Sequence, residues 1–266
     1  MPNTPNHLFR ALLTLLAWLA ATSLVGALLR QDGSGSIVEL VGFLGSNPAW
    51  NVLAGLSVLA VATRAFGFRG LGFGPADGWA MAKLVWFPIL TLVPFYAIAL
   101  AIGLPPPRVM LFLAVNTALV ALSEEWMFRG VLFQALQSRL RIWPAVALTS
   151  VLFGSIHVLN AFALGDLRIA AAQAVAATMT GFLLIALMLR TGSIWTAVVY
   201  HMVWNFGILL VVYETAGNPL PEGPLPLSAY LVPILVVLPN FLFGLILLRK
   251  LRHDPAPGRE VLAKDG

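Results

Sequence analysis

Residues 111–133 read LFLAVNTALVALSEEWMFRGVLF, an apolar run that is long enough to cross a lipid bilayer as a helix. Within this run stand Glu124, Glu125 and Arg129. An ionised side chain at bilayer depth costs roughly 2.5–3.5 kcal/mol on insertion scales, so such side chains usually belong to a functional site. The stretch therefore predicts a membrane-spanning helix that carries a polar site.

The composition of the whole chain is that of a membrane protein. Of its 266 residues, 59% are hydrophobic and 10% are charged, whereas roughly 25% of the residues in a soluble domain are charged. Cysteine is absent, which excludes disulfides, a thiolate metal site and a cysteine nucleophile. The net charge of +5 comes from scattered basic residues, so we expect the lipid bilayer as a partner and no nucleic acid.

Eight apolar segments have the length that crosses a bilayer as a helix, about 20 residues each. We therefore predict an all-α fold, a polytopic transmembrane bundle of about eight spans. The first segment exceeds the roughly 7–15 apolar residues of a signal peptide, so we expect it to be a span. A glycine-rich segment, 67–78, lacks the GxGxxG spacing and predicts an interfacial turn. The predicted spans are residues 8–29, 49–66, 79–103, 109–135, 143–162, 169–189, 194–213 and 229–248.

Three parts follow from this division of the chain. Residues 1–108 hold three N-terminal spans, and residues 109–213 hold the spans with chemically active side chains. Residues 214–266 comprise an outer connection, the last span and a basic tail.

Lysine and arginine predict the orientation of the spans, because cytoplasmic loops carry an excess of both. If the N-terminus is cytoplasmic, twelve of the sixteen basic residues fall on the inner side. The outer side then carries Arg30, Arg108 and Arg168, while Arg129 lies within the membrane. We therefore expect both termini in the cytoplasm. Richness in Ala, Leu, Arg and Gly favours a bacterial source, and hence the bacterial cytoplasmic (inner) membrane.

The two glutamates of the fourth span are expected to differ in role. Glu125 and Arg129 are four residues apart, so they share a helix face and can pair. Pairing lowers the cost of burying both charges. Glu124 is rotated by about 100° from Glu125 in an α-helix and would point elsewhere, free for chemistry. The alternative is that both glutamates are structural and hold helices together by hydrogen bonds.

Two later spans each carry a histidine in a four-residue spacing. Phe153 and His157 share one face of the fifth span, and His201 and Asn205 share one face of the seventh. Either histidine alone could be a hydrogen-bonded core residue. Measured at about 1.5 Å per residue from the cytoplasmic ends, Glu124 lies roughly 16 Å deep, His157 roughly 20 Å and His201 roughly 10 Å. These depths allow one polar pocket that opens to the cytoplasm.

These patterns resemble the motifs of the CAAX protease and bacteriocin-processing family, also called the Abi family. Residues 124–130, EEWMFRG, resemble its EExxxR motif, and residues 153–157, FGSIH, match FxxxH. Residues 201–205, HMVWN, match HxxxN, and residues 189–195, LRTGSIW, resemble the usual segment before that motif. The resemblance covers about 110–210 and includes every motif position.

The resemblance implies an intramembrane endopeptidase related to the type II CAAX prenyl endopeptidases. Its partner would be a peptide or protein substrate, with lipidation of the substrate left open. Glu124 would be the general base for an attacking water, and His157 would hold that water or pass on the proton. Donors facing the oxyanion would be His201 and Asn205. The supporting residues would be Glu125, Arg129 and Phe153.

Other mechanisms and functions remain open at this point. Glu124, His157 and His201 could instead bind Zn²⁺ with an open position for water, although the HExxH spacing is absent. We favour the form without a cofactor. The non-enzymatic alternatives are a membrane scaffold or immunity protein and, less favoured because no inverted repeat is apparent, a proton-coupled transporter.

Overall fold

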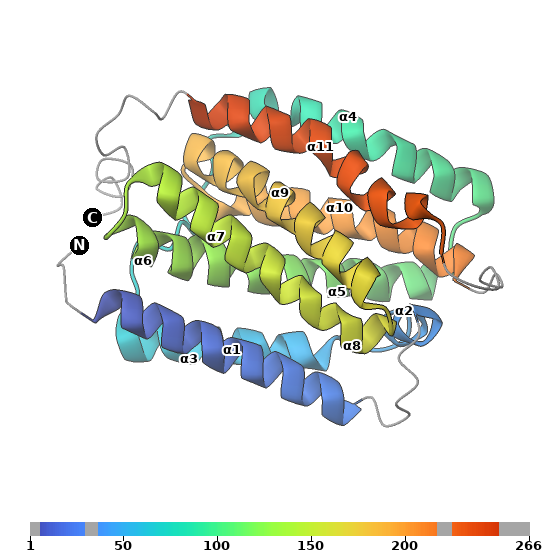
Figure 1. Ribbon diagram of the computed structural model, residues 1–266, viewed down its shortest axis with the longest axis horizontal. Coiled ribbons are helices and arrows are strands. Elements are labelled where there is room, and N and C mark those ends of the chain that lie inside the picture. Colours follow the sequence, from blue (N-terminus) through green and yellow to red (C-terminus); the bar gives the residue numbers. More distant parts are fainter. Residues whose placement is uncertain (1–5, 30–36, 217–224, 250–266) are drawn as a thin grey trace.

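The computed structural model describes residues 6–29, 37–216 and 225–249 (Figure 1). Over these residues every regular element is helical, and no strand occurs. The elements are α1 (His7–Leu29), α2 (Ile37–Leu44), α3 (Trp50–Phe66), α4 (Gly78–Ile102), α5 (Pro107–Glu125), η1 (Trp126–Leu132), α6 (Phe133–Gln137), α7 (Ile142–Ile156), η2 (His157–Asn160), α8 (Ala161–Leu164), α9 (Leu167–Thr191), α10 (Ile194–Thr215) and α11 (Leu227–Arg249).

The all-α prediction is confirmed for the described residues, and each predicted span coincides with helix. Seven helical stretches are long and apolar enough to cross a membrane. The remaining predicted span corresponds to α3, an apolar helix of 17 residues. Its passage through the bilayer therefore remains a prediction. The short helix α2 was not predicted, because eight residues are too few to show a spanning pattern.

The helices run antiparallel in a bundle with the site-bearing helices in its middle (Figure 1). One flank is the pair α1 and α3, and the other consists of α4 and α11. Between them lie α5, α7, α9 and α10, with α9 in contact with α7 and α11, and α10 in contact with α5 and α4. Residues from three separate segments, 107–137, 142–164 and 194–215, can therefore meet in the interior.

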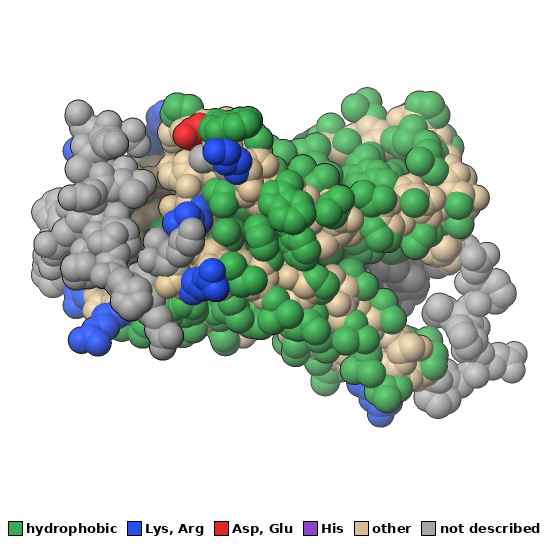
Figure 2. Space-filling model, turned by 90° about the horizontal axis from the view of Figure 1, so that it is seen from above, with side chains coloured by type: hydrophobic (Ala, Val, Ile, Leu, Met, Phe, Trp, Pro, Cys, Tyr) green, Lys and Arg blue, Asp and Glu red, His purple; other side chains and the backbone are tan. Residues whose placement is uncertain are grey.

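Basic side chains gather toward the end of the bundle where α1 begins (Figure 2). The ends of α3, α9 and α11 and the α6–α7 connection lie there too (Figure 1). Arg108 and Arg168 stand at the opposite helix ends, as predicted. Arg30 and the tail residues Lys250, Arg252, Arg259 and Lys264 lie outside the described residues. That the basic end is cytoplasmic remains a prediction of the charge bias.

The glycine-rich segment forms the connection between α3 and α4. Gly67, at a φ of 66°, ends α3 in the left-handed conformation that glycine adopts without strain. The connection then passes the α9–α10 turn, whose residues donate hydrogen bonds to three successive carbonyl groups of the connection. Ile194 N donates to Gly72 O at 2.8 Å. Ser193 Oγ donates to Gly74 O at 2.6 Å, and Trp195 Nε1 donates to Phe73 O at 3.0 Å. These three hydrogen bonds fix the glycine-rich connection to the α9–α10 turn.

Because the chain contains no cysteine, single cysteines can test the orientation and the crossing of α3. We expect Ser46→Cys and Ser228→Cys to react with a membrane-impermeant maleimide on spheroplasts. Arg69→Cys and Ser138→Cys should react only after permeabilisation, because they lie at the basic end. Labelling of Ser46→Cys and Arg69→Cys from the same side would show that α3 does not cross.

Candidate active site

The helix that carries the two glutamates changes its geometry directly after them. α5 ends at Glu125 and continues into η1, a π-helical segment, before α6 begins. The Phe133 N–H accordingly donates to the Phe128 carbonyl, five residues back. Such segments inside helices are frequent at functional sites. The predicted span over 109–135 coincides with this helical stretch, but the π-helical segment within it was not predicted, because hydropathy does not report the register of backbone hydrogen bonds.

Arg129, within η1, forms the predicted ion pair with Glu125. The two atoms, Arg129 Nη1 and Glu125 Oε1, lie 3.1 Å apart, and both side chains are fully buried. Arg129 Nη2 also donates to the carbonyl of Gly181 in α9 at 3.4 Å. Its guanidinium carbon lies 4.3 Å from the ring centroid of Phe153, a cation–π contact. The arginine thus links η1 to α7 and α9.

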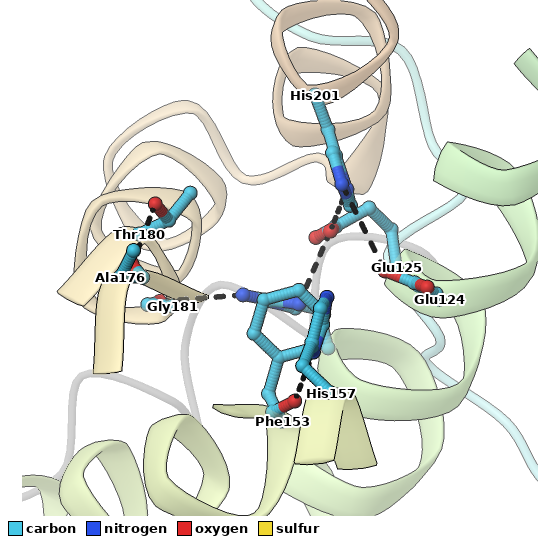
Figure 3. Close-up of polar contacts among 9 residues, drawn as sticks. Glu124, Glu125, Phe153, His157, Ala176, Thr180, Gly181 and His201 are labelled. Carbon is cyan, nitrogen blue, oxygen red and sulfur yellow. Dashed lines mark hydrogen bonds and ion pairs between the residues drawn. The ribbon is translucent and has the colours of Figure 1, made fainter. Parts of the chain in front are cut away.

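His201 joins the same carboxylate from α10. Its Nδ1 lies 2.9 Å from Glu125 Oε1, the oxygen that also accepts from Arg129. Because an ionised carboxylate only accepts hydrogen bonds, Nδ1 carries the proton and donates it. This bond fixes the plane of the imidazole and turns its second nitrogen, Nε2, toward Glu124 (Figure 3).

Glu124 makes a different contact from its neighbour Glu125. Its Oε2 lies 3.8 Å from His201 Nε2, so the two glutamates face opposite nitrogens of one ring (Figure 3). A single imidazole thus lies between the two side chains despite their angular separation. Glu124 Oε2 has no hydrogen-bond partner among the described residues, and its side chain is 16% exposed. The carboxylate is therefore free to bind a proton or a water.

His157 approaches the cluster through Phe153. The Phe153 ring stands edge-on to both imidazoles, at centroid distances of 5.1 Å to His157 and 6.0 Å to His201. The His157 Nδ1 donates to the Phe153 carbonyl at 2.9 Å, which leaves Nε2 as the nitrogen with a lone pair (Figure 3). His157 is half-buried and begins the 3₁₀ segment η2, where α7 ends.

Asn205 lies one turn beyond His201 on α10 and is not bonded to this cluster. It lines a neighbouring cavity between α5 and α10. The structure thus links six predicted residues by direct contacts, and it places the seventh beside them on the same helix face. The six in contact are Glu124, Glu125, Arg129, Phe153, His157 and His201.

Several supporting contacts were not predicted from the sequence. Trp18 Nε1 in α1 donates at 2.9 Å to the hydroxyl of Ser123, directly before Glu124. Asn160 Nδ2, at the end of η2, donates to Gln173 Oε1 in α9 at 3.1 Å and so fixes the turn after His157. A polar residue in an apolar run was the available signal, but the distant partner cannot be read from spacing.

The zinc alternative finds no preformed cluster. Over the described residues, no group of three or more His, Asp or Glu side chains is gathered as a metal site. Glu124 and His201 face each other directly, whereas His157 is joined to His201 only through the Phe153 ring. The choice between a metal-bound and a metal-free water thus needs a chemical test.

Removing one member of the buried pair should destabilise the protein more than removing both. We expect Glu125→Gln and Arg129→Met each to lower the free energy of unfolding by about 3–5 kcal/mol, because each leaves an uncompensated charge. The double variant should lose less than the sum of the two. Unfolding by SDS in mixed micelles, followed by circular dichroism, measures all three, with Arg64→Met as an exposed control. Additive losses would contradict the coupling.

Comparison with known families adds an independent observation. Residues 106–207 match the family model described as Type II CAAX prenyl endopeptidase Rce1-like. The matched segment runs from the start of α5 into α10 and contains all three motifs. The resemblance found in the sequence is thereby confirmed. No curated protein matches the chain.

Proposed function

We propose that this chain, whose residues 106–207 match the CAAX prenyl endopeptidase family model, is an intramembrane endopeptidase that hydrolyses peptide bonds with a water activated by Glu124. The observation that carries this proposal is the position of His201 between two carboxylates inside the helical bundle. Its Nδ1 lies 2.9 Å from Glu125 and its Nε2 lies 3.8 Å from Glu124. A carboxylate without a hydrogen-bond partner beside an oriented imidazole is an arrangement suited to proton transfer.

Charge balance supports an assignment of protonation states. Two ionised glutamates beside Arg129 alone would leave a net negative charge in a low-dielectric interior. A protonated His201 makes the group of four neutral, which lowers the cost of burial. In that state Nε2 carries a proton that can be donated to an oxyanion, while Glu125 keeps the ring in position.

The reaction then proceeds through a tetrahedral intermediate. Glu124 removes a proton from a water molecule, and the resulting hydroxide attacks the scissile carbonyl carbon. The carbonyl oxygen becomes an oxyanion that accepts hydrogen bonds from His201 Nε2 and from the Asn205 amide. The carbon–nitrogen bond breaks as the amine receives the proton that Glu124 took up, directly or by way of His157. The products are one new carboxyl group and one new amino group.

Phe153, Glu125 and Arg129 support this chemistry without taking part in proton transfer. The Phe153 ring separates the two imidazoles and packs against the guanidinium of Arg129. Groups held in this way need no rearrangement as charge develops, which is the main source of electrostatic catalysis. The substrate is a peptide or protein that reaches this depth of the membrane.

Replacing the proposed base should abolish cleavage and leave the fold intact. We expect Glu124→Gln to lower kcat by at least about 10²-fold, because general-base catalysis contributes about 10²–10⁴. KM should change little and the variant should remain folded, since Oε2 of Glu124 has no hydrogen-bond partner within the described residues. The assay is mass-spectrometric detection of cleavage in a proteome-derived peptide library, with Glu214→Gln as the control. Undiminished cleavage by Glu124→Gln would favour a scaffold role.

Metal removal separates the two mechanisms of water activation. We expect activity to survive exhaustive treatment with EDTA and 1,10-phenanthroline, because the proposed base is a carboxylate. Loss of activity that Zn²⁺ alone restores would instead assign the water to a zinc ion held by Glu124, His157 and His201.

A further inference from the structure

A cavity of about 150 Å³ lies between α2, α5 and α10, and one of the proposed catalytic residues, Asn205, lines it. Its walls are mainly aliphatic, and its few polar members come from α5 and α10. The lining residues are Leu44, Asn116, Thr117, Val120, Asn205, Ile208 and Leu209.

The cavity continues the faces that bear the proposed catalytic groups. Val120 is one turn before Glu124 on α5, and Asn205 is one turn after His201 on α10. These two helices run antiparallel and are in contact. Their facing sides carry the proposed reacting groups, and one turn further along they form walls of the cavity. A peptide whose scissile carbonyl lies at His201 has the cavity within reach of its neighbouring side chain.

The polar groups of the cavity are almost all occupied by the protein itself. Asn116 accepts from Ala49 N and donates to Leu44 O and Asn47 O, each at 2.8 Å. Thr117 donates to Leu113 O in its own helix at 2.9 Å. No hydrogen bond of the Asn205 amide is found over the described residues, so it is the polar group left for a ligand. The cavity is thus apolar in its body and polar where it meets the catalytic groups.

The same contacts of Asn116 make the cavity rigid. The Asn116 amide binds Leu44, Asn47 and Ala49 in the α2–α3 connection, and Leu44 at the end of α2 lines the cavity. A preformed apolar cavity of this size accommodates a benzene-sized group.

We propose that this cavity is the specificity pocket of the enzyme, which receives the apolar side chain of the residue beside the scissile bond. Leucine, methionine and phenylalanine have the size and polarity that it accommodates. Asn205 binds the peptide backbone at the entrance, and Val120 and Ile208 determine which side chains enter. This inference rests on the proposed function for its assignment as a subsite.

The first experiment measures cleavage preference. Val120→Phe should fill the pocket, whereas Val115→Phe, at a position 44% exposed on the same helix, should not. In a peptide library the wild type should favour large apolar residues at one position beside the cleaved bond. Val120→Phe should shift that preference by at least about tenfold toward glycine and alanine, the scale expected for altered pocket size. An unchanged preference, or a uniform loss of cleavage, would overturn the proposal.

The second experiment measures occupation of the pocket without catalysis. In the cysteine-free chain, Val120→Cys combined with Glu124→Gln can be alkylated by a small maleimide. Alanine pentapeptides with leucine at each position in turn should slow this alkylation at least about threefold for one position. The glycine counterparts should not slow it, and Val115→Cys should be unaffected. Equal protection by leucine and glycine peptides would overturn the pocket.

The two experiments distinguish failure of the pocket from failure of the proposed function. Protection of Val120→Cys without any cleavage by the wild type would keep the pocket as a peptide-binding site and reject the protease. Cleavage that depends on Glu124 but ignores the size of residue 120 would keep the protease and reject the pocket.

Discussion

A single buried oxygen atom, Oε1 of Glu125, organises the centre of this protein. An ionised carboxylate without exposure to water is stable in a membrane only if it is paired and hydrogen-bonded. Arg129 and His201 both bind this atom, at 3.1 Å and 2.9 Å, and they come from η1 and α10. The arginine then reaches Gly181 in α9 and the ring of Phe153 in α7. Four segments are therefore held together because one charge must be compensated.

The same constraint gives the proposed site its chemistry. With Nδ1 bound to Glu125, the imidazole of His201 can present only Nε2 to Glu124. The two adjacent glutamates have identical side chains, so any difference between their proposed roles comes from their different contacts. Glu125 Oε1 binds two donors and its side chain is fully buried, whereas the Glu124 side chain is 16% exposed and its Oε2 has no hydrogen-bond partner within the described residues. The roles proposed for the two neighbouring carboxylates can differ because the imidazole of His201 lies between them.

Hydropathy and spacing predicted the helices and the pairing of Glu125 with Arg129, because both depend on local sequence. Spacing also placed Phe153 with His157, and the ring contact agrees. The short helix α2 was missed because its eight residues are too few to show a spanning pattern. The π-helical turn and the supporting contact to Ser123 were not predictable in this way, because both involve residues far apart in the chain. Trp18 and Ser123, for example, are separated by 105 positions, and neither residue type indicates the other.

The segment that matches the family model is packed against residues that lie outside it in the sequence. It begins at residue 106, yet the π-helical turn inside it is packed against residues that precede it. Trp18 binds the hydroxyl of Ser123, and the Phe73 ring stands edge-on to Trp126 at 5.1 Å. At Gly130 a Cβ atom would lie 3.3 Å from the Leu71 carbonyl, so the backbones approach closely there. Residues on both sides of Glu124 and Glu125 are thus fixed from outside the segment that bears the motifs. The N-terminal helices, which carry no motif of their own, therefore contribute to the site by packing against the π-helical turn and the residue before the two glutamates.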